Sequence, residues 1–234
     1  MLPEIDAEGQ QLLADARVLI IGLGGLGSSS SVYLAAAGVG HLVLVDFDEV
    51  DISNLQRQIV HATSDIGRLK VDSAKEHLLR LNPEIKITTI DHKIEDTSLE
   101  EQVKPASVVI DCSDNFQTRF AINAVCVRLK IPLVSGAAIR FEAQVSVFNN
   151  NHKDSPCYRC LYGTEAEVEQ TCTANGVISP LLGIVGSIQA CEAMKIIMDI
   201  GETLEGRLLL LDVLHMEWHT AKLNKDPACP VCSR

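Results

Sequence analysis

Four glycines and one aspartate near the N-terminus have the spacing of a nucleotide-binding site. The run VLIIGLGGLGSS places them at Gly22, Gly24, Gly25 and Gly27. Such glycines permit a tight turn and let the backbone approach phosphate, whose charge then faces the N-terminus of the next helix. Asp46 comes 19 residues after Gly27, where an acid accepts hydrogen bonds from ribose hydroxyls. We predict a nucleotide site rather than a bare strand-to-helix turn, with NAD, FAD and ATP still open.

Charged residues beyond Asp46 favour ATP among these nucleotides. Arg57 lies in the run DFDEVDISNLQRQ and Lys70 in GRLKVDSA, and two cations can clamp the negative charge that builds on a triphosphate. Asp114 and Asn115 follow the buried run SVVIDC, at the carboxyl edge of the predicted sheet. An acid there can hold Mg²⁺ against phosphate oxygens. The alternative is that Arg57 and Lys70 are solvated helix charges.

Two cysteine pairs have the spacing of metal ligands. Cys157 and Cys160 form one CxxC motif, and Cys229 and Cys232 form another after 68 intervening residues. Each turn can present two sulfurs to one ion, and four thiolates complete a tetrahedral, structural Zn²⁺ site. The alternative is a pair of redox motifs. Three other cysteines fall within apolar patterns and are expected in the core: Cys112, Cys126 and Cys191.

Strands and helices that would position these residues alternate up to residue 135. We expect strands over residues 17–21, 41–46, 85–90, 107–112 and 132–135, and helices over 26–37, 66–81 and 116–130. An antiparallel strand over 141–148, a helix over 181–198 and strands over 207–211 and 216–221 follow. This order predicts an α/β fold, a Rossmann-like doubly wound, mostly parallel sheet with an antiparallel C-terminal extension. We expect one domain over 1–234, with a nucleotide-binding half over 1–135 and the cysteine pairs in 136–234.

Composition narrows the possible partners. Apolar residues make up 47% of the chain and aromatic residues only 4%, which suits a buried parallel sheet. The formal net charge of -11 argues against nucleic acid as a partner. The N-terminus lacks the pattern of a signal peptide, and the apolar runs are short and interrupted by glycine or charge. We therefore expect no membrane partner and a cytoplasmic location.

Taken together, these motifs resemble those of one enzyme family. GLGGLG, Asp46, SNLQRQ, Lys70, DCSDN and SGAAIR, together with the paired CxxC motifs, are similar in order and spacing to the ThiF/MoeB/HesA family of sulfur-carrier protein adenylyltransferases, relatives of the ubiquitin-activating enzymes. The resemblance implies ATP-dependent adenylation of the C-terminal glycine of a small ubiquitin-like carrier protein, with release of pyrophosphate. It implies a role in thiamine or molybdopterin biosynthesis, and it agrees with a structural Zn²⁺ site.

The same resemblance assigns roles to individual residues. It implies that Gly25 and Asp46 contact ATP and that Lys70 lies beside the triphosphate. The phosphate side would be lined by Ser53, Asn54, Leu55, Gln56 and Arg57. Asp114 and Asn115 would complete the site, Asp114 acting through Mg²⁺. Arg57, Lys70 and Asp114 are thus the predicted catalytic residues.

Further expectations concern Cys172 and the partners. Cys172 lies in the polar run QTCTANGV, where a thiolate can attack an acyl-adenylate or resolve a persulfide, and family members differ in needing it. The family implies a homodimer and, before a sequence like Leu2-Pro3-Glu4-Ile5, an arginine segment that reaches the partner's ATP site. That segment does not precede Leu2 here, so we expect its contribution to be altered. The chain ends soon after Cys232, so we expect a separate sulfur donor.

Two alternatives to the adenylation hypothesis remain. One is a non-catalytic homologue that binds ATP and a carrier with a C-terminal Gly-Gly, and the other is an NAD-dependent oxidoreductase. The oxidoreductase hypothesis gives Arg57 and Lys70 no role. The motifs also leave open whether the carrier resembles ThiS or MoaD. SGAAIRFEAQ is more similar to MoeB, whereas TCTANGV and CPVC fit ThiF equally well.

Overall fold

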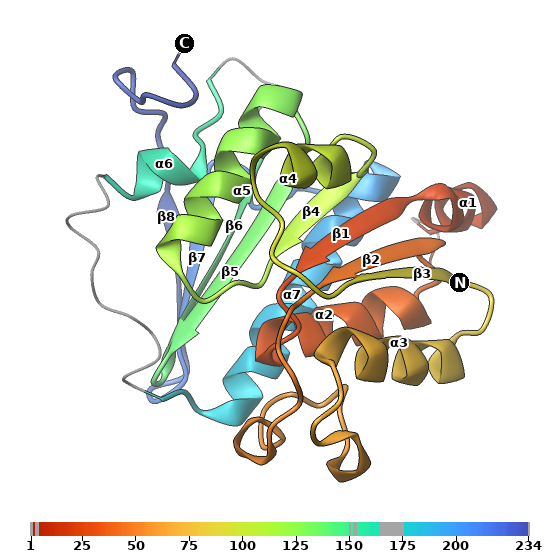
Figure 1. The fold of residues 1–234 in the computed structure, drawn as a ribbon. Coiled ribbons are helices and arrows are strands. Elements are labelled where there is room, and N and C mark those ends of the chain that lie inside the picture. Colours follow the sequence, from red (N-terminus) through yellow and green to blue (C-terminus); the bar gives the residue numbers. More distant parts are fainter. Residues whose placement is uncertain (1, 3–4, 150, 152–153, 164–175, 234) are drawn as a thin grey trace.

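The computed structural model describes residues 2, 5–149, 151, 154–163 and 176–233. An eight-stranded sheet forms its centre, and Figure 1 shows helices on both sides of this sheet. The spatial order of its strands is β3-β2-β1-β4-β5-β6-β7-β8. The first five are parallel, and β6, β7 and β8 are added antiparallel. Their bounds are β1 Arg17–Ile21, β2 His41–Val45, β3 Lys86–Ile90, β4 Val108–Asp111, β5 Leu133–Ile139, β6 Glu142–Phe148, β7 Arg207–Asp212 and β8 Glu217–Lys222. The predicted fold class is confirmed.

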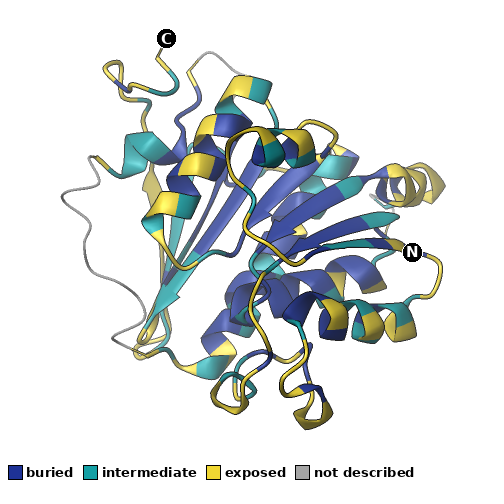
Figure 2. Cartoon of the chain, in the orientation of Figure 1, coloured by how far each residue is buried: buried dark blue, intermediate teal, exposed yellow. Residues whose placement is uncertain are grey.

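Helices cover both faces of the parallel half, which explains why β1, β2 and β4 are apolar on both faces. Their bounds are α1 Ala7–Asp15, α2 Gly25–Ala36, α3 Lys70–Leu81, α4 Asp96–Val103, α5 Phe116–Leu129, α6 Tyr158–Leu161 and α7 Ser179–Met198. One core lies between the sheet and α1, α2, α3 and α7, and the other lies between the sheet and α4, α5 and α6. Figure 2 shows the dark blue strands enclosed between these two layers.

Several local features differ from the sequence predictions, and three helices, α1, α4 and α6, were not predicted. The helix expected over 66–81 begins only at Lys70, because Gly67 has a φ of +82° and Glu49 pairs with Leu69 in an isolated β-bridge. Helix α4 was not predicted, since its sequence DTSLEEQV buries only Leu99 and Val103 and has little apolar periodicity.

Helix α7 is apolar because it is a core helix. It packs along α2 and across β5 and β6. Its length and composition would also suit a membrane span, although half of that stretch is buried inside the fold. The prediction that Cys191 belongs to the core is wrong, because this α7 residue faces solvent, whereas Cys112 and Cys126 are buried as expected.

Candidate active site

A cavity of about 1110 Å³ opens at the carboxyl ends of β1, β2 and β4. Strands β1 and β4 are neighbours in the sheet although β2 and β3 separate them in sequence. The strand order therefore changes direction between β1 and β4. Ligands of doubly wound folds bind at this switch point. Most of the predicted nucleotide-site residues line the cavity, namely Gly22, Gly24, Gly25, Asp46, Asn54, Gln56, Arg57, Lys70, Asp114 and Asn115.

The glycine loop is joined to the end of β2 through Asp46. One carboxylate oxygen of Asp46 accepts the Leu23 N–H at 2.7 Å, and the other accepts the Asp48 N–H at 2.9 Å. Burial raises the pKa of Asp46, while Lys70 and these two N–H donors oppose that shift. Asp46 therefore fixes the shape of the loop and also lies at the cavity wall.

Three glycines of the loop differ in what a Cβ atom would contact at their positions. A Cβ on Gly27 would lie 1.9 Å from the Gly22 carbonyl oxygen, so this glycine is required for the helix to approach the loop. A Cβ on Gly25 would lie 2.4 Å from Leu182 Cδ1, so α7 needs this glycine for packing, in addition to any close approach of a phosphate. A Cβ on Gly24 would meet only Gln58 Nε2, at 3.7 Å.

We predict opposite effects for alanine at two of these positions. Gly27→Ala should lower the free energy of unfolding by about 3 kcal/mol or more, because a backbone carbonyl cannot move aside cheaply. Gly24→Ala should leave stability within about 0.5 kcal/mol but weaken ATP binding, because the added methyl group enters the phosphate side of the cavity. Urea denaturation and nucleotide titration measure the two effects, and equal stability of both variants would contradict the assignment.

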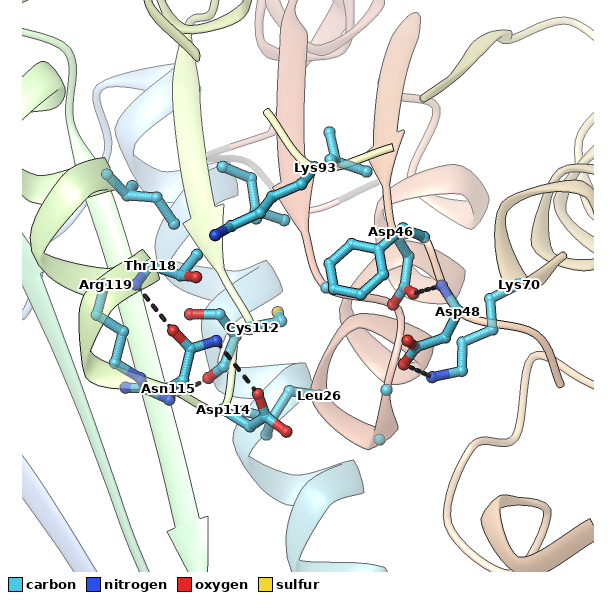
Figure 3. A pocket seen from close by; sticks show the side chains of 18 of the residues that line it. Leu26, Asp46, Asp48, Lys70, Lys93, Cys112, Asp114, Asn115, Thr118 and Arg119 are labelled. Atoms are coloured by element: carbon cyan, nitrogen blue, oxygen red, sulfur yellow. Dashed lines mark hydrogen bonds and ion pairs between the residues drawn. The ribbon is translucent and has the colours of Figure 1, made fainter. Parts of the chain in front are cut away.

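Cationic side chains reach the cavity from the segment between β2 and α3. Arg57 is held by its own turn, with Nη1 donating to the Ser53 carbonyl at 3.1 Å and Nη2 to Asn54 Oδ1 at 2.8 Å. Lys70, the first residue of α3, is 5% exposed and forms an ion pair with Asp48 at 2.7 Å. Figure 3 shows Lys70 and Asp48 on the wall of the cavity that faces Asp114.

Asp114 is presented by a loop that is fixed from both sides. Asp111, at the end of β4, accepts hydrogen bonds from the Ser113 N–H at 3.0 Å and from its hydroxyl at 2.6 Å. The buried Arg119 donates to the carbonyl of Ser113 and, at 3.0 Å, to that of Gly136. Asn115 caps α5 by accepting the Thr118 N–H. The exposed Asp114 carboxylate is thus held at the cavity by a rigid backbone (Figure 3).

His61 lies beside the glycine loop, close to the backbone of Leu23. Its burial leads us to expect that the stability of the fold depends on pH. Its Nδ1 lies 2.8 Å from Ser73 Oγ, and burial lowers its pKa to about 4 from 6.5. The unfolded chain therefore binds a proton between pH 6.5 and 4 that the folded chain does not. We expect the free energy of unfolding to fall by about 3 kcal/mol as the pH drops through this window.

Denaturation of His61→Gln from pH 7 to pH 4 tests this expectation. The variant should lose part of the pH slope, while His92→Gln, at an imidazole with a side chain 70% exposed, should keep it. An unchanged slope in His61→Gln would show that other groups cause the acid sensitivity.

Some predicted residues lie elsewhere, and some lining residues were not predicted. Gly27, Ser53 and Leu55 do not line the cavity, and the Ser53 hydroxyl instead donates to Asp51 at 2.6 Å. Cys172 lies outside the described residues. Lining residues that were missed include Phe47, Asp48, Lys93, Ile94, Glu95, Thr118 and Arg119. The position of residues 93–95 after β3 was the available signal, since the carboxyl ends of parallel strands share one edge.

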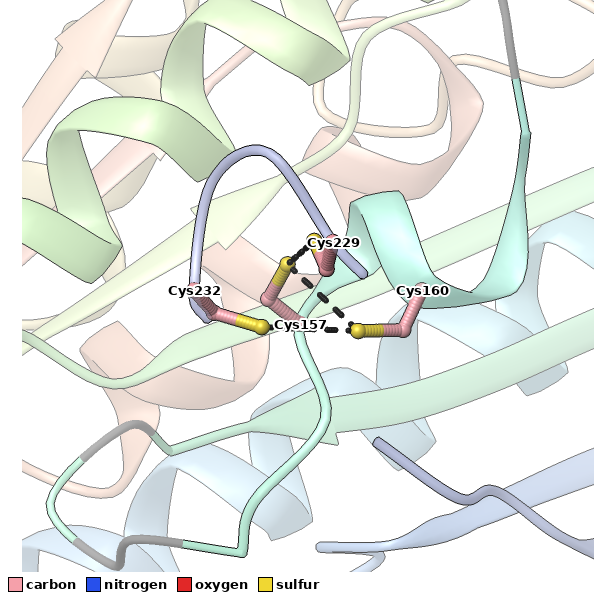
Figure 4. Close-up of side chains that lie close together, drawn as sticks. All are labelled: Cys157, Cys160, Cys229 and Cys232. Carbon is pink, nitrogen blue, oxygen red and sulfur yellow. Dashed lines mark hydrogen bonds between the residues drawn. The ribbon is translucent and has the colours of Figure 1, made fainter. Parts of the chain in front are cut away.

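A second site joins the two CxxC motifs (Figure 4). The four Sγ atoms of Cys157, Cys160, Cys229 and Cys232 lie within 4.8 Å of one another. Cys157 and Cys229 are 3.7 Å apart, and Cys160 and Cys232 are 3.4 Å apart. A tetrahedron of 2.3 Å metal–sulfur bonds has edges of about 3.8 Å. The cluster therefore fits one tetrahedral metal ion.

Hydrogen-bond donors surround these sulfurs. Asn123 Nδ2, on α5, lies 3.6 Å from Cys157 Sγ, and the Asp226 N–H lies 3.4 Å from Cys160 Sγ. Such donors stabilise thiolates that bind a metal. The side-chain oxygen of Asn123 also accepts the Tyr158 N–H at 2.9 Å, which fixes the turn between the first two cysteines. Because no coordination position remains open on a four-cysteine ion, the expected role is structural.

The fold and the cavity define a nucleotide-binding α/β protein in which the glycine loop faces two cationic side chains and a carboxylate. Residues 1–231 match the ThiF family, and the chain belongs to this family.

Relatives with known names cover the whole chain. The molybdopterin-synthase adenylyltransferase of Salmonella typhimurium is 44% identical over 234 residues, covering 100% of this chain and 94% of that protein. The sulfur carrier protein ThiS adenylyltransferase of Escherichia coli is also 44% identical, over 99% of this chain and 92% of that protein. The SAMP-activating enzyme E1 of Haloferax volcanii is 44% identical, with 99% and 86% covered.

Solved structures agree with the fold. A crystal structure of E. coli MccB with ATP has a TM-score of 0.85 at 26% identity and covers 96% of this chain and 69% of that one. A crystal structure of MccB with a succinimide has a TM-score of 0.86 at 25% identity, over 97% of this chain and 68% of that one.

Proposed function

We propose that this protein uses ATP to adenylate the C-terminal glycine of a small ubiquitin-like sulfur-carrier protein and releases pyrophosphate. The observation that carries the proposal is the single cavity shared by the glycine loop, Arg57, Lys70 and Asp114. Relatives at 44% identity that are named adenylyltransferases support it. Since the two named types are equally similar, we propose the shared chemistry and let the experiment identify the carrier.

The charges of the cavity suit this reaction. A carboxylate that attacks the α-phosphate is an anion approaching an anion, so cations must offset the repulsion. In our proposal Arg57 and Lys70 do so, the N–H groups of the glycine loop bind phosphate, and Asp46 binds the ribose. The attacking carboxylate is already ionised near neutral pH, and the reaction therefore requires no general base.

Two metal ions belong to the proposal. Asp114 provides an exposed carboxylate at the cavity, a suitable ligand for Mg²⁺, which when bound would neutralise phosphate charge. The four-cysteine cluster would hold Zn²⁺, whose role would be to fasten the segment around Cys229 to α6. The assignment of the cavity residues named above to ATP and Mg²⁺ is likewise part of the proposal.

Further partners follow from the same proposal. Large apolar side chains are exposed on the segment between β2 and α3, namely Phe47, Ile52, Ile59 and Ile66. We infer that a second copy of the chain covers them in a homodimer, and light scattering after gel filtration tests this state. We also propose a separate sulfur donor and a covalent role for Cys172, supported by Gly176 and Val177, which follow it in sequence and line the cavity.

Exchange of labelled pyrophosphate into ATP tests the function. The assay is run with a ThiS-like and with a MoaD-like carrier, each ending in Gly-Gly, and with each carrier lacking the final glycine as control. Exchange that requires one intact carrier supports adenylation and identifies the carrier. Binding of ATP and carrier without exchange would favour the non-catalytic homologue, and tighter binding of NAD than of ATP would favour the oxidoreductase.

A further inference from the structure

Lys70 is paired with a carboxylate of the protein itself. Its Nζ lies 2.7 Å from Asp48 Oδ2, as the dashed line in Figure 3 marks. The Lys70 side chain is 6% exposed, and that of Asp48 is 55% exposed. Both residues line the cavity. The ammonium group assigned above to a triphosphate is therefore already occupied by an anion of the protein.

The position of Lys70 explains why it needs such a partner. Helix α3 begins at Lys70, so the positive end of the helix dipole disfavours a second positive charge there. Burial adds to this cost, because an unpaired ammonium loses its water. An anion must compensate in the ligand-free protein, and Asp48 is the one that the structure places in contact.

The backbone holds the two residues side by side. The Lys70 N–H donates to the Asp48 carbonyl at 2.9 Å, and the neighbouring residues Glu49 and Leu69 form a β-bridge. Asp46 accepts the Asp48 N–H, which fixes the other side of the same residue. The Asp48 side chain itself is free to turn toward solvent, since more than half of it is exposed.

From these contacts we propose that Asp48 is an exchangeable counterion for Lys70. In the empty site it neutralises the buried ammonium, and a phosphate group displaces it when a nucleotide binds. A nucleotide whose phosphates reach Lys70 must then break the Asp48–Lys70 pair, which lowers the apparent affinity for that nucleotide. Asp48 thus lowers the affinity for ATP but not for AMP, which lacks the phosphates proposed to reach Lys70; this property rests on the proposed ATP-binding function.

Binding of Mg-ATP and of AMP to Asp48→Asn tests the proposal by calorimetry. We expect Mg-ATP to bind roughly three- to tenfold more tightly than to the parent protein, because a partly exposed pair is broken at modest cost. The ATP-to-AMP affinity ratio should rise by the same factor, because AMP lacks the phosphates that would displace Asp48. In the absence of ligand the variant should melt at a lower temperature, and saturating ATP should remove most of this difference.

Two further variants make the result specific. Asp15→Asn removes the same charge at an exposed position at the end of α1 and should change no nucleotide affinity. In a Lys70→Gln background, Asp48→Asn should no longer tighten binding, because its effect acts through Lys70. Weaker or equal ATP binding in Asp48→Asn would overturn the proposal and indicate that Asp48 only positions Lys70. If the parent protein does not bind Mg-ATP, the proposed function fails instead.

Discussion

Asp114→Asn should lower the rate of carrier-dependent pyrophosphate exchange by about 100- to 1000-fold, the effect of losing one strong electrostatic contact in a transition state. The substitution keeps the size of the side chain and removes its charge, so Mg²⁺ would lose a carboxylate ligand. The apparent Mg²⁺ requirement should rise, while the protein should stay folded because Asp114 is exposed and the loop beneath it is held by Asp111 and Arg119. Exchange rates over a Mg²⁺ titration measure both effects.

The matched control for this prediction is Asp15→Asn, which removes an exposed carboxylate on α1. It should retain the exchange rate of the parent protein within a factor of about two. Full activity and an unchanged Mg²⁺ requirement in Asp114→Asn would show that Asp114 does not bind the metal. Another carboxylate that lines the cavity would then be the candidate Mg²⁺ ligand. Circular dichroism of both variants separates loss of activity from loss of fold.

The sequence predicted the parts of this site that depend on local geometry. A glycine loop between a buried strand and a helix, and an acid at the end of the next strand, are close in sequence and have one plausible arrangement. Residues at strand ends, such as Asp114, followed from the rule that parallel strands share a carboxyl edge. The structure places Gly24, Asp46 and Asp114 together for these reasons.

Other features required contacts that no local pattern contains. The roles of Asp48 and Lys70 depend on the β-bridge between Glu49 and Leu69, which joins the two ends of a long irregular segment. A short 3-10 turn over Ile52–Asn54 leads into the SNLQRQ run and turns Ser53 away from the cavity. A motif therefore indicated which segment binds, but not which of its side chains face the ligand.

Contacts between helices that are distant in sequence were also not predictable. Gly25 seemed to serve only the phosphates, yet α7, more than 150 residues later, places Leu182 against it. The exposure of Cys191 had the same origin, since a helix that is apolar nearly all round does not reveal which residue faces solvent. In both cases the deciding neighbour comes from a distant element.

The four-cysteine cluster gives the prediction with the largest effect on stability. Structural zinc contributes about 10–16 kcal/mol to the folding of small zinc-finger peptides, which is comparable with the whole free energy of unfolding of a typical domain. Cys157 and Cys229 are buried at 0% and 2% exposure, so a Cys157→Ser variant would lose a ligand and leave the metal site poorly completed in the interior. We expect it to melt at least about 10 °C lower, with less than one metal ion per chain.

Cys191→Ser is the matched control, because it changes the same residue type at an exposed position outside the cluster. It should keep one zinc per chain and its melting temperature within about 2 °C. Hydrogen exchange adds the location of the effect, since loss of the metal should release residues 224–233 first, the segment that the cluster ties to α6. A four-cysteine zinc site would be excluded if Cys157→Ser kept the metal content and melting temperature of the parent protein. If residues 224–233 still exchanged slowly after chelation of the metal, side-chain packing alone would hold this segment.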